Sequence, residues 1–414
     1  MNLKYGCIGE KLGHSFSKEI HNLIADYDYD LKEIPKDGLD AFMKARDFKA
    51  INVTIPYKEA VIPYLYEIDD AARAIGSVNT IVNRNGRLYG YNTDFYGMES
   101  LLLHAGISLE GKKVAILGTG GTSKTAKAVS AAHGARAILT VSREKKDGVI
   151  TYEELTADHK DTEVIINTTP VGMYPKINAS PVDLSCFDHL SGVVDAVYNP
   201  LRTRLILDAK KRGIPAEGGL YMLVAQAIRA SEIFLDTSYN KQTLDKIYTK
   251  ILRDKENIVL IGMPACGKST VSRILSTMLE RDIFDTDSII EKESGSRISD
   301  IFEKNGEAYF RDFESDAVRS VAHHHSSIIA TGGGAILRNQ NVEDLRLNGR
   351  LYFIDRPLDS LIPTSSRPLA SSVDAIKKRY NERYNIYKEV ADALIDASCP
   401  ALEVANKIKE DFYK

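Results

Sequence analysis

The sequence predicts an α/β protein built from consecutive nucleotide-binding folds. Short apolar, β-branched runs alternate with segments of helical periodicity along most of the chain. The runs 114–117 and 258–261 are continuously apolar, and each is followed by a glycine loop and a helical stretch. Such runs are typical of central parallel strands that are covered on both faces. The 414 residues exceed what a single core holds, about 250 to 300 residues, so we expect two or three domains.

The composition is that of an ordinary folded protein. Hydrophobic residues make up 43% of the chain, and 54 Lys and Arg face 57 Asp and Glu, for a net charge of −3. A balanced chain has no global positive field for nucleic acid or anionic lipid. The start lacks the apolar core of a signal peptide, and no apolar run approaches the ~20 residues that span a bilayer. We therefore expect a cytoplasmic protein with small-molecule partners, no nucleic acid and no membrane, whose oligomeric state stays open.

A polar segment separates the predicted folds. Residues 238–257 carry many charges around a helical stripe of Leu244, Ile247 and Ile251, and a new strand begins directly after them. We place the boundary at about residue 254. The glycine loops on its two sides differ in chemistry, and no periodic self-similarity appears elsewhere. Two unrelated folds in tandem explain the sequence better than a duplication.

The carboxy-terminal part opens with a phosphate-binding loop. Gly262, Gly267, Lys268 and Ser269 complete the pattern GxxxxGK[ST] directly after a predicted strand and at the start of a helical stretch. Glycines let backbone N–H groups surround phosphate oxygens, the lysine reaches the outer phosphates, and the serine hydroxyl can bind magnesium. A glycine turn beside a surface lysine is the plainer alternative. The motif predicts a site for a nucleoside triphosphate and Mg²⁺.

Further motifs concern the molecule that would accept the phosphate. Asp285 and Asp287 end a short predicted strand, and their carboxylates share a face if the chain stays extended. Arg311 lies three residues before Glu314 on a predicted helix, so the carboxylate can hold the guanidinium; a surface ion pair is the alternative. The glycines 332–334 follow another strand and permit backbone contact with a ligand, or form a flexible turn.

Together these motifs resemble shikimate kinase from about residue 257 to the end of the chain. The matching stretches, in the order of that family, are the P-loop, Asp285 with Asp287, Phe310-Arg311 with Glu314, Gly332 to Gly334, Arg367-Pro368-Leu369, and Arg383 with Tyr387 and Ala391. The resemblance implies a P-loop kinase domain with a parallel sheet over 255–414, using ATP and Mg²⁺. Residues 361–363 stand where the family often has an arginine, so we expect loose nucleotide binding.

The same resemblance implies roles for individual residues. Nucleotide contacts fall to Gly262, Gly267, Lys268, Ser269 and Thr270. Shikimate contacts fall to Asp287, Arg311, Gly333 and Arg383. The residues expected to take part in catalysis are Lys268, Asp287 and the lid residue Arg367. Those expected to bind magnesium are Ser269 and Asp285. Phosphoryl transfer depends mainly on positioning and charge neutralisation, which such residues supply.

The amino-terminal part has a different glycine loop. Gly118, Gly120 and Gly121 follow a predicted strand as in a dinucleotide fingerprint, with Ser123 in place of the third glycine. Read from Gly118, the loop is also close to a second P-loop, which fails only at Ser123. The next strand ends at Arg143 without an acidic residue, which favours the extra phosphate of NADP. A solvated loop cation is the alternative for Arg143.

Polar residues of the first hundred positions complete a candidate site. They are Ser15, Ser17, Asn52, Thr54, Lys58, Asn79 and Asp94. Asn52 and Thr54 fall on one face of the predicted strand 50–55. Plain alternatives are a helix N-cap for Ser17, a surface lysine for Lys58 and a first-turn acid for Asp94. Gln226 falls on the apolar stripe of a later helix, so its amide requires a ligand or a backbone partner.

This constellation is similar to shikimate dehydrogenase over about residues 3–236. The matches are HSxS, NVTxPxK, GxVNT, GxNTD, the glycine loop, the Ser142-Arg143 pair, Asn167 to Met173, Tyr198 to Thr203 and Gly219 to Gln226. The resemblance implies a substrate lobe, 1–100, completed by helices from about 220–250, and a Rossmann-type NADP lobe, 101–219.

In that family's pattern, Lys58 and Asp94 form the catalytic pair. Substrate contacts fall to Ser15, Ser17, Asn52, Thr54, Asn79 and Gln226. NADP(H) contacts fall to Gly118, Gly120, Gly121, Thr122, Ser142, Arg143 and Thr168. A cationic Lys58 oriented by Asp94 can stabilise and protonate the alkoxide that hydride transfer leaves on a ketone.

The sequence therefore predicts a bifunctional enzyme of chorismate biosynthesis. Its first half would reduce 3-dehydroshikimate with NADPH, and its second half would phosphorylate shikimate with ATP. Two alternatives stay open: a quinate-preferring dehydrogenase joined to another small-metabolite kinase, and a non-catalytic sensor of these metabolites. The presence of Lys58, Asp94, Lys268, Asp287 and Arg311 disfavours the sensor.

Overall fold

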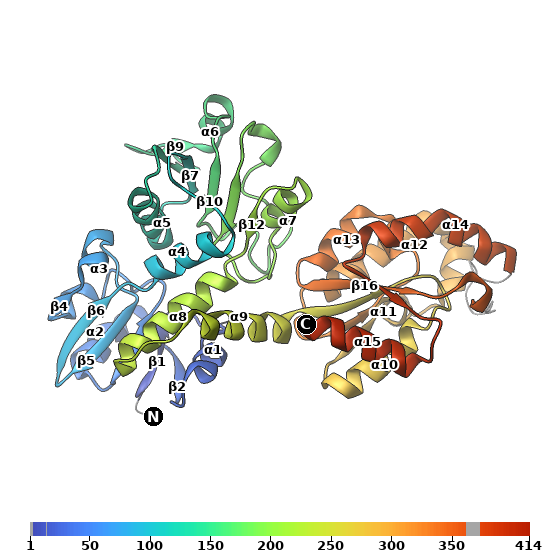
Figure 1. Ribbon diagram of the computed structural model, residues 1–414, viewed down its shortest axis with the longest axis horizontal. Helices are drawn as coiled ribbons and strands as arrows, with labels where there is room; N and C mark the ends of the chain where they lie inside the picture. Colours follow the sequence, from blue (N-terminus) through green and yellow to red (C-terminus); the bar gives the residue numbers. More distant parts are fainter. Residues whose placement is uncertain (1–2, 14, 362–372) are drawn as a thin grey trace. The chain divides into compact units, whose positions relative to one another are not determined.

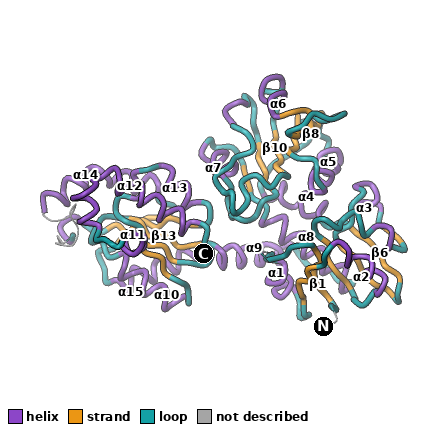
Figure 2. Tube along the Cα trace, turned by 180° about the vertical axis from the view of Figure 1, so that it is seen from behind, coloured by secondary structure: helices purple, strands orange, loops and turns teal. Residues whose placement is uncertain are grey.

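The computed structural model describes residues 3–13, 15–361 and 373–414. It divides into two compact units, Met1–Asn199 with Thr203–Ile251 and Pro200–Arg202 with Leu252–Lys414. Each unit is built on twisted sheets with helices packed against them (Figures 1 and 2). Among the described residues no helix is long and apolar enough to cross a membrane. The predicted α/β class is confirmed.

The first unit contains two sheets, each of six strands. The first sheet has the order β2-β1-β3-β5-β6-β4 and is mixed, with antiparallel pairing only at β3/β5 and β5/β6. Its strands are β1 (Tyr5–Gly9), β2 (Tyr29–Glu33), β3 (Ala50–Val53), β4 (Glu67–Ile68), β5 (Thr80–Arg84) and β6 (Arg87–Tyr91). Its helices are α1 (Ser17–Ile24), η1 (Lys36–Gly38), α2 (Leu39–Ala45), η2 (Ile62–Tyr64), α3 (Asp70–Ile75) and α4 (Asp94–His104).

The second sheet is parallel throughout, with the order β12-β11-β10-β7-β8-β9. Its strands are β7 (Lys113–Leu117), β8 (Ala137–Ser142), β9 (Ile150–Thr151), β10 (Val164–Asn167), β11 (Gly192–Asp195) and β12 (Ala216–Glu217). The helices that follow them are α5 (Gly121–Ala132), α6 (Tyr152–Asp158), η3 (Leu184–Cys186), α7 (Arg204–Lys211), α8 (Leu220–Leu235) and α9 (Lys241–Lys255). The chain order reverses at β7 and β10, and ligands of open α/β sheets bind at such a switch point.

The second unit has a parallel five-stranded sheet, β14-β15-β13-β16-β17. Its strands are β13 (Asn257–Ile261), β14 (Ile283–Asp285), β15 (Ile328–Ala330), β16 (Gly349–Asp355) and β17 (Ala393–Asp396). Its helices are α10 (Lys268–Leu279), α11 (Thr286–Ser294), α12 (Ile298–Ala322), η4 (Ala335–Leu337), α13 (Asn339–Arg346), η5 (Leu358–Ser360), α14 (Val373–Val390) and α15 (Ala401–Tyr413). Figures 1 and 2 show α12, α13 and α14 on one face of this sheet and α10 and α15 on the other.

Central strands carry the cores, as their continuous apolar runs predict. Every residue of β13 is buried, and so are four of the five residues of β7. One predicted strand is shorter than expected: β3 ends at Val53 and not at residue 55. Pro56 has no backbone N–H to extend the ladder, which accounts for this early end. Thr54 therefore lies just past the strand, where its N–H still donates to the carbonyl of Ile8 at 2.9 Å.

A buried histidine makes the stability of the first unit depend on pH. His21 on α1 is fully buried and stacks on Tyr29 with ring centroids 3.8 Å apart. Its Nδ1 bonds the hydroxyl of Tyr27, whereas its Nε2 is buried without a hydrogen-bond partner. Burial lowers the pKa of His21 to about 3, so the ring is neutral in the folded protein.

This histidine should destabilise the first unit in mild acid. Below a pH of about 6.5, His21 is protonated in the unfolded chain but stays neutral in the folded protein. The free energy of unfolding therefore falls as the pH falls toward 3. Between pH 7.5 and pH 5 wild type should lose about 2 kcal/mol more than His21→Phe, which keeps the ring stacking. Urea unfolding of the two proteins at each pH measures this difference. Hydrogen exchange of the β1 and β3 amides measures it for the first sheet separately. The same pH dependence in both proteins would contradict the role of His21.

Candidate functional site

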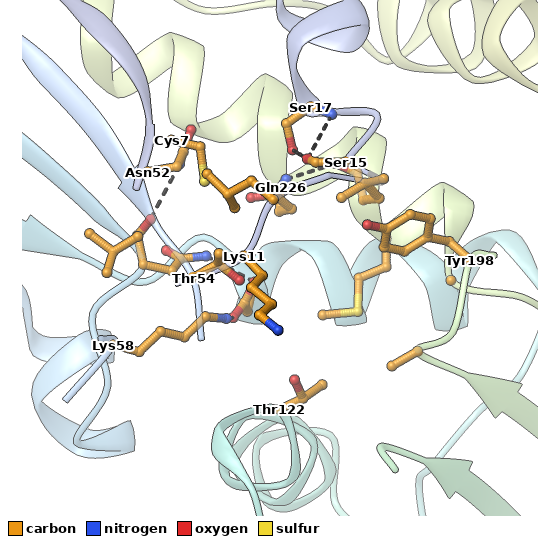
Figure 3. A pocket seen from close by; sticks show the side chains of 18 of the residues that line it. Cys7, Lys11, Ser15, Ser17, Asn52, Thr54, Lys58, Thr122, Tyr198 and Gln226 are labelled. Carbon is orange, nitrogen blue, oxygen red and sulfur yellow. Dashed lines mark hydrogen bonds and ion pairs between the residues drawn. The ribbon is translucent and has the colours of Figure 1, made fainter. Parts of the chain in front are cut away.

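A cavity of about 350 Å³ gathers the polar residues of the first unit (Figure 3). Of the residues that the sequence singles out, it is lined by Ser15, Ser17, Asn52, Thr54, Lys58, Asn79, Asp94, Thr122 and Gln226. They come from α1 and the loop before it, from β3 and the loop after it, from the residue before β5, and from α4, α5 and α8. The structure thus places all the substrate-contacting residues expected in the first unit around one space.

Lys58 and Asp94 form an ion pair at this cavity. Lys58 Nζ donates to Asp94 Oδ2 at 2.5 Å, and the two side chains are 17% and 10% exposed. Asp94 is the first residue of α4, and its second oxygen accepts from Asn79 Nδ2 at 2.9 Å. The first-turn position of Asp94 is therefore real, yet the carboxylate also orients a lysine that is largely shielded from water. A surface-lysine interpretation of Lys58 does not fit this burial.

A chain of hydrogen bonds fixes the side chain of Asn52, which lines the same cavity as Lys58 and Asp94. The hydroxyl of Tyr29 donates to Asn52 Oδ1 at 2.7 Å, and Asn52 Nδ2 donates to Thr80 Oγ1 at 3.1 Å. Thr80 Oγ1 in turn donates to Asn79 Oδ1 at 3.0 Å. Asn52, Asn79 and Thr80 are all buried, so each polar group has its position set by its neighbours. The pair and its polar surroundings are consequently preorganised.

Two serines lie at another wall of the cavity. Ser15 Oγ donates to Ser17 Oγ at 3.0 Å and accepts from the Ser17 N–H at 3.2 Å. Ser17 is the first residue of α1, and Phe16 occupies the N-cap position without a side-chain capping bond. The N-cap interpretation of Ser17 is therefore wrong, because its hydroxyl points at Ser15 and the cavity and not at the helix backbone.

Gln226 has the partners that its place in α8 requires. Its Nε2 donates to the carbonyl of Leu223 at 2.9 Å, and its Oε1 accepts from Thr93 Oγ1 at 3.3 Å. The side chain is only partly buried and lines the cavity. The helical stripe therefore brings one amide to the cavity among otherwise apolar neighbours.

The glycine loop after β7 approaches the same cavity. Gly118 has a φ of 110°, and a Cβ there would lie 2.8 Å from Thr168 Oγ1. A Cβ at Gly121 would lie 3.9 Å from Cδ of Lys58, so the start of α5 comes close to the ion pair. Ser123, which replaces a glycine, donates its hydroxyl to the carbonyl of Gly118 at 2.7 Å and closes the loop.

This loop fits a dinucleotide phosphate. Gly120 is the N-cap of α5, and a Cβ there would meet no atom within 4 Å, so there is open space beside the start of the helix, where phosphates commonly bind. Arg143 follows β8 directly and is exposed, next to Ser142 at the strand end. The open backbone and the cation beyond the neighbouring strand match the needs of a phosphorylated dinucleotide.

The phosphate-binding loop of the second unit connects β13 to α10. Gly262 and Gly267 have φ values of 146° and 104°, which side chains rarely adopt. Lys268 is buried, and its Nζ donates to the carbonyls of Gly262 at 2.8 Å and Met263 at 3.0 Å. The amino group lies inside the curled loop, where phosphate oxygens can replace these carbonyls. Thr270 continues the helix start through a bond from its N–H to the Gly267 carbonyl.

Two oxygen donors for a divalent cation lie beside this loop. Ser269 Oγ donates to Asp285 Oδ2 at 3.1 Å, and Asp285 Oδ1 caps α11 by accepting from the Ser288 N–H at 3.2 Å. A hydroxyl and a carboxylate next to a phosphate loop are the hard ligands that Mg²⁺ prefers. The residues present thus fit the metal that the motif implies.

Asp287 differs from its expected geometry. The helix α11 begins at Thr286, because Asp285 caps it, so Asp285 and Asp287 do not share the face of an extended strand. Asp287 instead points toward the glycine triplet: a Cβ at Gly332 would lie 2.5 Å from its Oδ1 and 2.8 Å from Oε1 of Glu314. The two carboxylates therefore face different groups: Asp285 contacts Ser269, and Asp287 lies beside Gly332.

Arg311 is buried in an ion-pair network. Its Nη1 donates to Glu314 Oε2 at 2.6 Å and its Nη2 to Glu307 Oε1 at 2.8 Å. The side chains of Arg311 and Glu314 are 9% and 1% exposed, which excludes the surface-pair alternative. Burial raises the pKa of Glu314, and Arg311 opposes that shift. A Cβ at Gly334 would come within 1.9 Å of Arg311 Nη1, so only glycine leaves room for the guanidinium.

Arg383 completes the cluster from α14. Its Nη1 donates to the carbonyl of Gly333 at 2.9 Å, and its side chain is buried. Tyr387, one turn on, donates to the same carbonyl at 2.5 Å and lies within bonding distance of the Gly262 carbonyl at 3.0 Å. The glycine triplet is thereby tied to the phosphate loop. The expected lid residue Arg367 lies outside the described residues.

Sequence reasoning missed several residues of these sites. Lys11, Cys7 and Tyr198 line the cavity, and Glu307 holds Arg311. Glu307 lies four residues before Arg311 on a helix, a spacing that could have revealed it. Tyr198 belongs to the stretch Tyr198 to Thr203, which matches shikimate dehydrogenase, but the sequence assigns no substrate contact to it. Nothing in the sequence marks Cys7, whose thiol is inert because burial raises its pKa to about 12.

Comparisons with known proteins match both parts of the chain. The family model "Shikimate dehydrogenase substrate binding domain" matches residues 7–81, and "Shikimate kinase" matches 264–412. A shikimate dehydrogenase (NADP(+)) of Clostridium perfringens is 38% identical over 265 residues, covering 60% of this chain and 97% of that protein. One of Halothermothrix orenii is 40% identical, covering 55% of this chain and 89% of that protein.

Solved structures of shikimate dehydrogenases match about 60% of the chain. Shikimate dehydrogenase 1 of Peptoclostridium difficile has a TM-score of 0.56 at 40% identity, covering 61% of this chain and 98% of its own. A chorismate mutase/shikimate 5-dehydrogenase fusion protein of Clostridium acetobutylicum has a TM-score of 0.57 at 37% identity, with 61% and 98% covered. The Thermus thermophilus shikimate 5-dehydrogenase, solved with NADP(H) and shikimate, has a TM-score of 0.54 at 27% identity, covering 60% and 99%.

The fold and sites define a two-lobed, dinucleotide-dependent oxidoreductase joined to a P-loop kinase. The dehydrogenase relatives are matched over nearly their full length. The chain belongs to the shikimate dehydrogenase family and carries a shikimate kinase domain after it. It is thus a bifunctional enzyme of the shikimate pathway that uses NADP and ATP.

Proposed function

We propose that the first unit reduces 3-dehydroshikimate to shikimate with NADPH, with Lys58 as proton donor. The observation that carries this proposal is the shielded Lys58–Asp94 pair at a cavity lined by hydroxyl and amide groups. NADPH supplies the hydride. Lys58 Nζ faces the ketone oxygen, stabilises the negative charge that grows there and delivers the proton that completes the hydroxyl. Asp94 and Asn79 keep the amino group in position.

The substrate's remaining groups bind to the neutral polar walls. The proposal places the ring hydroxyls against the amides of Asn52, Asn79 and Gln226 and the hydroxyl of Thr54. The hydroxyls of Ser15 and Ser17 receive the carboxylate. Their fixed mutual hydrogen bonds support this, because a preorganised wall binds a polyol acid at a lower entropic cost than mobile side chains would.

The second unit is proposed to phosphorylate the 3-hydroxyl of shikimate. Mg²⁺-ATP supplies the phosphoryl group, and Ser269 and Asp285 would hold the metal. Arg311 and Arg383 offer two buried cations for the substrate carboxylate, with Gly333 supplying backbone contact. Asp287 lies beside the glycine triplet, where its carboxylate can accept the proton of the attacking hydroxyl. Lys268 neutralises charge on the transferred phosphate.

Two assays on the purified chain test the whole proposal. NADPH oxidation is followed with 3-dehydroshikimate, and ADP release is followed with shikimate. Turnover in both assays is expected. A preference for quinate over shikimate in the reverse reaction would instead support the quinate-specific alternative, and binding without turnover in both assays would support the sensor.

Cofactor choice should depend on Arg143. Arg143→Ala is expected to lower kcat/KM for NADPH by about tenfold and to leave that for NADH nearly unchanged, because only NADP carries the ribose phosphate. Lys145→Ala is the matched control, since the neighbouring Lys145 pairs with Glu154. Equal losses for the two cofactors would show that Arg143 supports the loop or another part of the nucleotide.

A further inference from the structure

The dehydrogenase cavity has one uncompensated charge. Its charged lining residues are Lys11, Lys58 and Asp94. Lys58 and Asp94 neutralise each other at 2.5 Å. Lys11 forms no hydrogen bond or ion pair with any residue in the described part of the chain. The cavity therefore carries an excess of one positive charge, located on Lys11.

The backbone on both sides of Lys11 is anchored. The Glu10 N–H donates to the carbonyl of Ile55 at 3.3 Å, and the Leu12 N–H donates to Glu33 Oε1 at 2.7 Å. The carbonyl of Leu12 accepts from the Ser15 N–H at 3.1 Å, which turns the loop back toward α1. Figure 3 shows the side chain of Lys11 directed into the open part of the cavity. The loop thus presents a lysine to the cavity from a fixed point.

We propose that Lys11 is a substrate-positioning residue that binds the carboxylate of the dehydrogenase substrate. This inference rests on the proposed function of the first unit. Ser15 follows in the same loop and Ser17 begins α1 directly after it. Their hydroxyls are neutral, so they cannot compensate the charge of an anion. The ammonium group supplies that charge and a charge-assisted hydrogen bond to the carboxylate. It also attracts the anion from solution.

The diphosphate of the dinucleotide is the competing partner. Thr122, in the first turn of α5, lines the cavity opposite this loop, so a nucleotide on the glycine loop would bring a second anion near. We assign Lys11 to the carboxylate because its anchored loop also carries Ser15 and leads directly into Ser17. The distinction is measurable, because the two partners are separate substrates of one reaction.

Steady-state kinetics of Lys11→Met test the assignment. The KM for 3-dehydroshikimate should rise about tenfold, while kcat and the KM for NADPH change less than about twofold. Lys11→Arg should restore most of the affinity, because it keeps the charge. Lys4→Met, at an exposed lysine that does not line the cavity, is the matched control and should behave as wild type.

Salt dependence gives a second measurement. With rising NaCl, kcat/KM for 3-dehydroshikimate should fall more steeply in wild type than in Lys11→Met, since salt screens the attraction. An unchanged KM for 3-dehydroshikimate, or a rise confined to the KM for NADPH, overturns the proposal. Wild-type turnover in the same assay tests the dehydrogenase function separately: an inactive wild type refutes that function, and an active wild type with an unaffected variant refutes only the role of Lys11.

Discussion

Replacing Lys58 by alanine is expected to abolish the dehydrogenase activity and to leave the kinase activity nearly unchanged. Proton transfer by a positioned side chain contributes about 10²- to 10⁴-fold, and Lys58→Ala removes both the proton and the charge at the reacting oxygen. We expect kcat for NADPH oxidation to fall by at least about 10²-fold. ADP release with shikimate, measured on the same preparation, should stay within about twofold because the two sites lie in separate compact units.

Folding has to be controlled in this experiment, because Asp94 loses its partner. Circular dichroism and thermal unfolding of Lys58→Ala should resemble those of wild type. Lys127→Ala, at an exposed lysine of α5, is the control for general loss of charge. Loss of kinase activity in a well-folded Lys58→Ala protein would contradict two independent sites.

Lys268→Ala should have the opposite effect. In the phosphate-binding loop the amino group donates to the Gly262 and Met263 carbonyls, the place that phosphate oxygens are expected to take. Without it the negative charge of the transferred phosphate lacks its preorganised cation, and loss of one such donor costs about 10²- to 10³-fold in kcat. ADP release with saturating shikimate measures the loss, and NADPH oxidation should be unaffected.

The matched control is Lys292→Ala, at an exposed position of α11 in the same unit. Calorimetric titration with Mg²⁺-ADP shows whether the variant still binds nucleotide. A Lys268→Ala protein with wild-type kinase kcat would exclude this lysine from the reaction. That outcome would also remove the main reason for assigning phosphoryl transfer to this loop.

The fold could be predicted wherever one local signal decides the structure. The buried strands β7 and β13 are continuous apolar runs that end in glycines, and no helix or exposed strand explains such runs as well. Element ends were less predictable, because they depend on competing short-range bonds. β3 ends early before Pro56. Asp285 caps α11, which begins at Thr286, so Asp287 lies in its first turn, and the alternation of a strand could not reveal this.

The candidate sites were predictable residue by residue but not in their geometry. Lys58 and Asp94 stand 36 positions apart, and only the fold brings their side chains to 2.5 Å. The helical spacing of Arg311 and Glu314 indicated a pair, whereas its burial follows from the glycine triplet on a different strand end. The position of Lys11 at the cavity could not be predicted. A loop lysine that faces solvent and one that lines a cavity cannot be distinguished in the sequence.

Because one polypeptide carries both units, a cell makes equal numbers of the two sites. Separate genes would let expression set how much of each enzyme is present, but here only kcat and KM of the two sites can balance successive steps. If the second step is slower than the first, its substrate accumulates until the kinase site is saturated. A variant that slows only one site, such as Lys268→Ala, should therefore change the steady-state concentration of shikimate in cells, and no increase in expression of this chain would restore the original balance.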